Sequence, residues 1–563
     1  MNLKEEIQKF FKGEVLDDEE TLKTYSHDAS LFEVRPKLVV YPQDSEDLKK
    51  LVKWVNDNTT IYRSNNEPLS ITIRAAGSCM AGGPLGESII VDVMRHMNRM
   101  GEVTTASGGV PPSAVIEPGV FYRDFEPKTL EKSLILPCFT ASKNMNALGG
   151  MIGNNCAGEK TLRYGKMENF ILESKVIFSD GNEYIVKPLL KPELDFKMKQ
   201  SDFEGNLYKN LFELIENNKR IIKEAKPNVS KNSAGYYLWN IWDGKTFDLN
   251  KLIVGSQGTL GLVTEAKVKL VSVEPVSKLF VIFLPDLTHI AKLVNEILPM
   301  NPDSLETYDD ATMKLAFRFF PEMLKSMKAK SFFKLILSFI PEALMIIKQF
   351  GIPKMFVLVE FAGQTEAEVD EKLVNLENKI KHFGFVMRRT KSEEESKKYW
   401  TIRRESFNLL RKHVRGKRTA PFVDDVVVRP EFMSEFLPKM KKILDEYKLV
   451  YTIAGHAGNG NFHIIPLMDM HDKRNIKVIK EVGKKIYDLV KEYKGSITGE
   501  HNDGIVRTPY LGKMYSQEIL ELFKKTKEIF DPQNIFNPGK KVPSTGSGQE
   551  GTIEYLENHI AIE

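Results

Sequence analysis

The sequence predicts an α+β protein with two parts of different architecture. In the first part, the apolar strand Leu38–Tyr41 precedes a helix with apolar residues at three-to-four spacing, and strands and helices alternate as far as "GLVTEAKVKLV". In the second part, long helices separate the strand-like segments "KLFVIFLP", "MFVLVEFAG" and "TIAGHAGNGNFHIIP". This pattern is typical of an antiparallel sheet with helices on one face. A chain of 563 residues is also too long for a single hydrophobic core.

Stop signals and changes in composition divide the chain further. The helical segment "SQEILELFKKTKEIF" ends at Asp531-Pro532, because proline cannot continue a helix. After Lys541, "VPSTGSGQEG" has the composition of a linker, and no strand precedes its G-x-G-x-x-G pattern, so it is not a dinucleotide fingerprint. We expect an N-terminal helical segment (1–34), a first domain (35–275), a cap domain (276–500), a segment that returns to the first domain (501–541) and a flexible tail (542–563).

Composition indicates a soluble enzyme and excludes several other classes. The net charge of +4 is small, so it gives no argument for nucleic-acid binding. The cysteines, Cys79, Cys138 and Cys156, are odd in number and lack C-x-x-C spacing, which argues against a disulfide framework, a structural zinc site or a ligated iron–sulfur cluster. The chain shows neither a signal-peptide pattern nor an apolar run long enough to span a membrane. We therefore expect a cytoplasmic protein.

The segment 313–354 is locally basic and apolar. It contains eight Lys or Arg against two Glu, interleaved with "FRFF" and "SFFKLILSFIP". One interpretation is a set of amphipathic helices that pack on a domain. The other is a face that lies on an anionic membrane surface, which would place the protein peripherally at the inner face of the membrane.

Three glycine-rich stretches have the character of ligand-binding loops. They are "RAAGSCMAGG" (74–83), "NALGGMIGNNCAG" (146–158) and "IVGSQGTLGLVTEA" (253–266). Glycines let backbone N–H groups approach an anionic ligand and adopt positive φ, so such loops can hold a pyrophosphate. Each loop alone is equally compatible with a tight turn.

Taken in order, and with "VIEPGV", "LPCFTAS" and "KNSAGY", these loops resemble the FAD-binding domain (PCMH type) of the vanillyl-alcohol oxidase superfamily. The branch resembled is that of the D-lactate and D-2-hydroxyglutarate dehydrogenases. It implies FAD held between two α+β subdomains beneath a cap domain. Because Ser78 and Cys79 stand where some members carry a tethering histidine, we expect noncovalent FAD. Gln257 replaces the usual glutamate of "GSEGTLG", in a loop expected to act mainly through its backbone.

The resemblance also implies which residues contact FAD. Carried over by position, they are Arg74, Ala76, Gly77, Ser78, Cys79, Gly82, Gly83, Pro137, Ser142, Gly149, Gly150, Asn154, Ala157, Gly158, Tyr164, Gly165, Gly258, Gly261, Val263 and Asn537.

Two motifs in the cap are similar to the family's metal and base motifs. In "HAGNGNFH" and "TGEHNDG", the resemblance implies His456, His463 and Glu500 as metal ligands and His501 as the catalytic base. Two imidazoles and a carboxylate leave coordination positions open for a 2-hydroxy acid, and zinc, iron(II) and manganese(II) all accept such ligands. We expect the metal to lower the pKa of the substrate hydroxyl, the base to accept its proton and the Cα hydride to reach flavin N5. Asn459 and Asn502 depart from the family's usual aspartate and glycine.

A substrate carboxylate needs a cationic partner. "YWTIRRESFNLLRK" resembles the family's W-x-I-R-E helix, but its arginine is doubled, so Arg403 and Arg404 are both candidates. Lys417 or Arg418 would supply the second cation that relatives place before a strand.

"FVDDVVVRPE" and "GEHNDGIVR" are similar to the branch that works with an iron–sulfur module. We therefore expect an FAD-linked D-2-hydroxy acid dehydrogenase that passes electrons to a quinone or a separate iron–sulfur protein. The alternatives are an oxygen-using oxidase of the same fold, a non-catalytic flavin subunit that transfers electrons or docks at a membrane, and an iron(II) oxygenase, which would leave the three loops unexplained.

Overall fold

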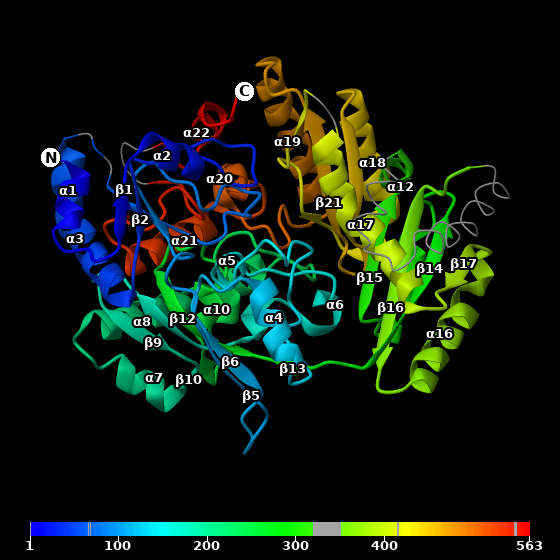
Figure 1. Cartoon of the computed structure of the whole chain (residues 1–563), viewed down its shortest axis with the longest axis horizontal. Helices are drawn as coiled ribbons and strands as arrows, with labels where there is room; N and C mark the ends of the chain where they lie inside the picture. Colours follow the sequence, from blue (N-terminus) through cyan, green and yellow to red (C-terminus); the bar gives the residue numbers. More distant parts are fainter. Residues whose placement is uncertain are drawn as a thin grey trace.

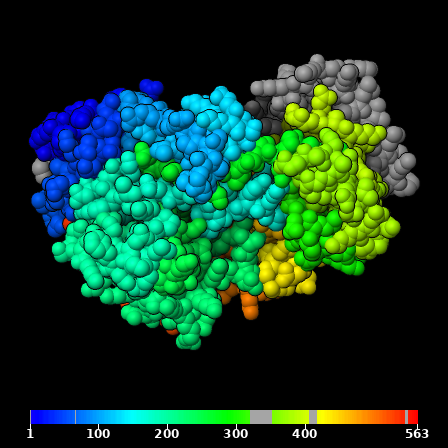
Figure 2. All heavy atoms as spheres, turned by 90° about the horizontal axis from the view of Figure 1, so that it is seen from below, coloured from blue at the N-terminus to red at the C-terminus, as the bar shows by residue number. Residues whose placement is uncertain are grey.

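The computed structural model describes residues 2–65, 67, 69–318, 351–413, 416–544 and 549–562, with the side chains of 405–413 left out. The N-terminal part (blue to green) and the cap (green to orange) lie side by side in Figure 1. Figure 2 shows the same neighbouring parts from below.

The first subdomain is built on a four-stranded sheet in which three consecutive strands run parallel and the fourth, at one edge, is antiparallel. Strand β4 pairs in parallel with both β2 and β3, and all four residues of β2 and of β4 are buried, as expected for strands covered on both faces. The sheet order is β1 (Glu14–Leu16), β2 (Leu38–Tyr41), β4 (Ile89–Asp92) and β3 (Ile71–Arg74), with helices α1 (Leu3–Gln8), α2 (Glu19–Tyr25) and α3 (Ser45–Ser64). Asp44 caps α3 by accepting from the N–H of Asp47.

The second subdomain is an antiparallel sheet of five strands. Along β12, buried residues alternate with half-exposed ones, which is the period of two expected for a strand with one face on the core. Its order is β5 (Met100–Thr104), β6 (Ser113–Ile116), β12 (Leu262–Lys269), β8 (Ile171–Ile177) and β9 (Glu183–Val186). Helices α4 (Tyr122–Leu130), α5 (Leu148–Asn154), α7 (Lys191–Lys197), α8 (Phe203–Asn217), α9 (Lys219–Ala225) and α10 (Asn250–Ile253) lie around it.

The cap is an eight-stranded antiparallel sheet, as the sequence predicts. Its longest pairing joins β14 to β16 from Val276–Gly363 to Leu284–Met355. The order is β17 (Val386–Arg389), β14 (Val276–Leu284), β16 (Met355–Gly363), β15 (Ser304–Asp309), β20 (Val450–His456), β21 (Asn461–Met468) and β18 (Arg418–Thr419), with β19 (Val426–Val427) also on β21.

Helices cover both faces of this sheet, whereas the sequence predicts helices on one face only. The reason lies in β14, which is apolar on both sides: Phe280 and Ile282 belong to one hydrophobic cluster, and Leu279 and Val281 to another. The first cluster includes helices α11 (Ile290–Ile297), α16 (Glu366–Ile380), α18 (Met433–Glu446) and α19 (Arg474–Glu492). The second includes α12 (Asp310–Arg318) and the start of α17 (Glu393–His413).

The chain returns from the cap to the first subdomain near its C-terminus. After α21 (Gln517–Phe530), the N–H of Ile71 donates to the carbonyl of Ile535, and the N–H of Asn537 donates to the carbonyl of Ile71. The Asn537 amide then donates to the carbonyls of Gly83 and Gln257, at 2.9 and 2.7 Å. One buried side chain therefore ties two glycine-rich loops together.

The predicted flexible tail is wrong for residues 549–562. Helix α22 (Ile553–Asn558) buries Tyr555 and Leu556, and Ile560 pairs with Phe32. These apolar residues follow the linker-like stretch and give the end of the chain a hydrophobic contact that composition alone conceals.

Most of the basic segment 313–354 lies outside the described residues, which resume at 351. Within the described part of the chain, no helix is both long enough and apolar enough to cross a membrane.

Replacing Asn537 by alanine tests the link between the loops. The carbonyls of Gly83 and Gln257 would lose a buried donor, so we expect the free energy of unfolding to fall by about 2 to 3 kcal/mol in urea denaturation followed by circular dichroism. The matched control is Asn98→Ala on the exposed surface, which should stay within about 0.5 kcal/mol of the wild type. Equal stability of both variants would contradict a structural role for Asn537.

Candidate functional site

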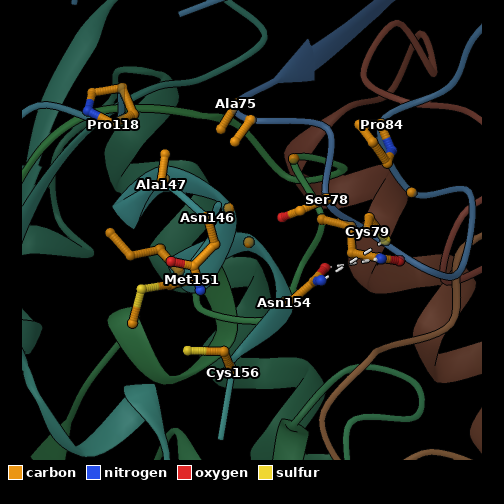
Figure 3. Close-up of a pocket in the computed structure, with 18 of the residues that line it drawn as sticks. Ala75, Ser78, Cys79, Pro84, Pro118, Asn146, Ala147, Met151, Asn154 and Cys156 are labelled. Carbon is orange, nitrogen blue, oxygen red and sulfur yellow. Dashed lines mark hydrogen bonds between the residues drawn. The ribbon is translucent and has the colours of Figure 1, made fainter. Parts of the chain in front are cut away.

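The three glycine-rich loops surround one cavity. It encloses about 1210 Å³ of space free of protein atoms, its open mouth included. Figure 3 shows its walls: Ala75, Ser78 and Cys79 from the first loop face Ala147, Met151 and Asn154 from the second. Gly258 and Gly261 of the third loop complete the lining.

Backbone rather than bulky side chains forms much of this lining. A Cβ added at Gly150 would have only the Cβ of Ala75, 3.8 Å away, within contact distance, and one at Gly153 would meet only Gln257 Cα at 3.9 Å. Gly77 and Gly258 adopt φ of +65° and +67°, a conformation that favours glycine. Exposed backbone of this kind suits a large cofactor with phosphate groups.

Twelve of the twenty predicted FAD contacts line the cavity. They are Ala76, Gly77, Ser78, Cys79, Gly83, Ser142, Gly149, Gly150, Asn154, Gly258, Gly261 and Val263.

The other eight predicted contacts are not among the residues that line this cavity, and they stay predictions. They are Arg74, Gly82, Pro137, Ala157, Gly158, Tyr164, Gly165 and Asn537. Arg74 turns away because its guanidinium donates to the carbonyls of Tyr25 and His27. A Cβ at Gly158 would come within 1.9 Å of the Phe139 carbonyl oxygen, so that glycine serves close packing of the chain. A motif match therefore includes residues that support the loops as well as residues that face the ligand.

Gln257 contributes more than its backbone, contrary to expectation. Its side-chain N–H group donates to Asn154 at 3.2 Å, and its oxygen accepts from the N–H of Gly504 at 2.9 Å. The side chain thus joins the second and third loops to the segment that follows the cap. Sequence reasoning also missed other residues of the lining: Pro118, Thr140, Asn146, Met151 and Ser256.

The predicted metal ligands converge at one edge of this cavity. His456 is the last residue of β20, and His463 lies on the neighbouring strand β21. Glu500 lies in a loop, and its side chain lines the cavity. Glu500 Oε1 lies 3.3 Å from His456 Nε2 and 3.2 Å from His463 Nε2. The ligand atoms of the three residues lie within 4.8 Å of one another, so they fit a single divalent cation with open coordination positions.

A carboxylate stands behind each histidine. Glu306 of β15 lies 2.6 Å from His456 Nδ1, and Asp424 lies 3.2 Å from His463 Nδ1 and 2.8 Å from His501 Nδ1. These contacts direct the Nε2 atoms toward Glu500, as carboxylates behind metal-bound histidines do. "FVDDVVVRPE" gave a signal for Asp424, whereas Glu306 sits in a buried strand and had none.

A buried lysine balances the charge of Glu500. Lys231 Nζ lies 2.8 Å from Glu500 Oε2 and is fully buried. Burial alone would raise the pKa of Glu500, but the charges of Lys231 and His456 hold it well below its usual range. Glu500 is therefore ionised, as a metal ligand must be.

The two histidines that contact Asp424 have pKa values above the ordinary value for histidine. Burial lowers the pKa of His463, but Asp424 and Glu500 outweigh that effect and raise it to about 10. For His501, burial is likewise outweighed by Asp425 and Asp424, so its pKa lies above its ordinary value. The two rings stack at 5.1 Å between centroids.

The four predicted carboxylate-binding cations separate in space. Arg403 is buried with Nη2 2.6 Å from Glu306, whereas the next residue, Arg404, pairs with Glu159. Lys417 is exposed and Arg418 is half-buried on β18. Arg403 is therefore joined through Glu306 to His456, one of the predicted metal ligands.

The two asparagine departures have structural partners. Asn459 donates to Ser230 Oγ at 3.1 Å, and Asn502, at φ +70°, donates to the carbonyls of Asn154 and Gly255. Asn502 thereby connects the cap motif to the second and third loops.

Comparison with known proteins places both parts of the chain in one family. Residues 36–186 match the model described as "FAD binding domain", and residues 274–541 match "FAD linked oxidases, C-terminal domain". D-2-hydroxyglutarate dehydrogenase of Pseudomonas putida is 26% identical over 96% of this chain and 51% of its own length. The glycolate oxidase subunit GlcD of Bacillus subtilis is 25% identical over 96% of both chains. D-lactate dehydrogenase of Arabidopsis thaliana is 24% identical over 90% of this chain and 74% of its own length.

The chain spans about half the length of four curated D-2-hydroxyglutarate dehydrogenases that it matches, that of Pseudomonas putida among them. Solved structures agree on the fold. The p-cresol methylhydroxylase structure aligns with a TM-score of 0.65 and 14% identity over 94% of each chain. The 4-ethylphenol oxidase of Gulosibacter chungangensis aligns with a TM-score of 0.64 and 15% identity over 94% of each chain. The two parts of the chain thus match, in order, the FAD-binding domain and the C-terminal domain of the FAD-linked oxidases.

Proposed function

We propose that the protein is an FAD-dependent dehydrogenase that oxidises a D-2-hydroxy acid to the 2-oxo acid, with a divalent metal held by His456, His463 and Glu500. Relatives named D-2-hydroxyglutarate dehydrogenase and D-lactate dehydrogenase support this class of substrate. Zinc, iron(II) and manganese(II) all suit two imidazoles and a carboxylate.

One observation carries the proposal. Glu500 and His501 line the same cavity as the glycine-rich loops, so a substrate held at the cap motifs would face a cofactor held by the FAD-binding domain. A metal site elsewhere in the cap would have no such access. The juxtaposition matches a reaction that needs both a proton acceptor and an electron acceptor at one carbon.

The residues of the chain have separate tasks in this reaction. When bound, the flavin supplies a two-electron acceptor and the cation a Lewis acid beside the substrate hydroxyl. His501, with Nδ1 held beside Asp424, presents Nε2 as the base for the hydroxyl proton. Arg403 is the proposed partner of the substrate carboxylate, and the apolar residues around Met151 and Ile152 limit water in the cleft.

The electron acceptor is the least constrained part of the proposal. The D-2-hydroxyglutarate dehydrogenase of Pseudomonas putida extends beyond this chain, and GlcD is by name a subunit, so both support a separate partner. We propose a quinone or an iron–sulfur protein, because the three cysteines here lack cluster spacing. Reoxidation by oxygen alone, at the rate of turnover, would instead favour an oxidase.

Anaerobic reduction of the bound flavin tests the activity directly. We expect D-2-hydroxyglutarate, D-lactate or glycolate to bleach the flavin absorbance, L-lactate to fail, and prior treatment with a chelator to slow bleaching at least about 100-fold, because the Lewis acid is lost. Readdition of Zn²⁺ or Mn²⁺ should restore it. Bleaching that persists after chelation would contradict the metal-assisted mechanism, and the absence of bleaching by any of the D-acids would contradict the substrate class.

His501→Asn tests the base. Loss of the proton acceptor should lower the rate of flavin reduction by about 10² to 10⁴-fold, while flavin and metal contents stay at wild-type levels. Stopped-flow absorbance at saturating substrate measures the rate. The matched control is His471→Asn, an exposed histidine in the turn after β21, and this variant should react as the wild type does. A variant of His501 with an unchanged rate would remove this residue from the mechanism.

Metal uptake should depend on pH. Since His463 keeps a proton up to about pH 10 without metal, the cation must displace it, and uptake should release close to one proton. The apparent affinity should therefore rise about ten-fold per pH unit between about pH 6 and about pH 8. Calorimetric titration in two buffers of different ionisation enthalpy measures the proton release. An affinity that is flat across this range would show that His463 is not the protonated ligand.

A further inference from the structure

A buried chain of charged groups runs through the candidate metal site and beyond it. Lys231 pairs with Glu500, Glu500 contacts His456, His456 contacts Glu306, and Glu306 pairs with Arg403. Glu306 is the residue in this series that contacts both a proposed metal ligand, His456, and the proposed carboxylate-binding arginine, Arg403.

The two oxygens of Glu306 have different partners. Oε1 lies 2.6 Å from His456 Nδ1, and Oε2 lies 2.6 Å from Arg403 Nη2. Glu306 and Arg403 have side chains 1% and 5% exposed, so neither contact is screened by solvent. The carboxylate is ionised, because Arg403 and His456 outweigh the effect of burial and lower its pKa.

The strand holds Glu306 rigidly between these partners. Glu306 lies in the middle of β15, paired with Leu358 of β16, and every residue of β15 is buried. Its neighbour Thr307 pairs with Gly455, the residue before His456. Because β15 is paired on both sides, with β16 and with β20, the Glu306 side chain has little freedom to exchange His456 for Arg403 as a partner.

The adjacent arginine provides an internal comparison. Arg404 pairs with Glu159, which is also poorly exposed, but no described contact joins Glu159 to a histidine. The protein therefore has two neighbouring arginine–carboxylate pairs. In the described part of the chain, the Arg403–Glu306 pair contacts a proposed metal ligand, and no described contact joins the Arg404–Glu159 pair to one.

We propose that Glu306 is a positioning residue that couples the metal site to Arg403: it orients His456 toward the metal and fixes the arginine that receives the substrate carboxylate. The inference rests on the proposed function for the identity of both sites. Metal and substrate carboxylate are then held in one geometry by a single side chain, and a change at either end is transmitted to the other.

Metal affinity, measured without turnover, tests this coupling. Calorimetric titration of chelator-treated flavoprotein with Zn²⁺ or Mn²⁺, whichever the wild type binds more tightly, gives the dissociation constant. We expect Glu306→Gln to weaken binding by about 10- to 100-fold, because the charged partner of His456 is lost. Glu159→Gln is the matched control and should bind metal as the wild type does. Flavin content and circular dichroism identify any variant that fails to fold.

Arg403→Met then tests whether a change at Arg403 affects the metal site through Glu306. Arg403 is paired with Glu306, so its removal should weaken metal binding by about 3-fold or more in the wild-type background, and should have no further effect when Glu306→Gln is already present. If Glu306→Gln does not fold, Glu306→Asp replaces it, since aspartate keeps the charge but is too short to reach both partners.

The outcomes separate the two ideas. A wild type that binds metal, with Glu306 variants of equal affinity or with additive effects of Arg403→Met, would overturn the coupling and leave the proposed function intact. A wild type that binds neither metal would overturn the metal-assisted function, and the coupling with it. Weakening that also appears in Glu159→Gln would show a general effect of removing a buried carboxylate, and would overturn the assignment to Glu306.

Discussion

The site depends on one carboxylate oxygen, Oδ2 of Asp425. It accepts from the backbone N–H groups of Gly499, Glu500 and His501 at 2.7 to 2.9 Å and from the hydroxyl of Thr498 at 2.7 Å. Four donors on one buried oxygen fix the loop that carries Glu500, the proposed metal ligand, and His501, the proposed base. Asp424, the preceding residue, meanwhile contacts the rings of His463 and His501. Backbone and side chains of the motif are thus set by two consecutive aspartates.

Burying so many carboxylates requires matching positive charge, since an unpaired buried charge is destabilising by several kcal/mol. Lys231 serves Glu500, and Arg403 serves Glu306. Arg507 is fully buried and donates to the carbonyls of Ile497, Asn502 and Asp424, so it joins the segments on either side of the motif. The cations are therefore part of how the site folds, and each anion near the proposed metal has a defined partner before any ligand arrives.

The sequence predicts the parts of this arrangement that follow local rules. The glycine loops and the antiparallel cap follow from local patterns, whereas the convergence of His456, His463 and Glu500 was expected from the family motifs, and the three side chains do meet. Glu306 could not be found in the same way, because its partners lie about a hundred and more residues away along the chain. The helices on the second face of the cap sheet were not predicted either, because an apolar run in the sequence does not show whether one or both sides of a strand are covered. Eight predicted FAD contacts are not among the residues that line the cavity, and two of them, Arg74 and Gly158, have structural contacts: a motif can include residues that face a ligand and residues that hold the loop.

The departure at Asn459 fits the same balance of charge. The family motif that this stretch resembles has aspartate there, yet here a neutral amide donates to Ser230 Oγ while Ser230 donates to the Asn459 carbonyl. This reciprocal pair fixes the residue immediately before Lys231 without adding another anion beside it. An ionised aspartate at 459 would introduce a second negative charge near the segment that carries the cation of Glu500. The amide therefore leaves Lys231 to Glu500 and to the side-chain oxygen of Asn461, at 2.8 and 3.3 Å, and keeps the ligand carboxylate in its place between lysine and histidines.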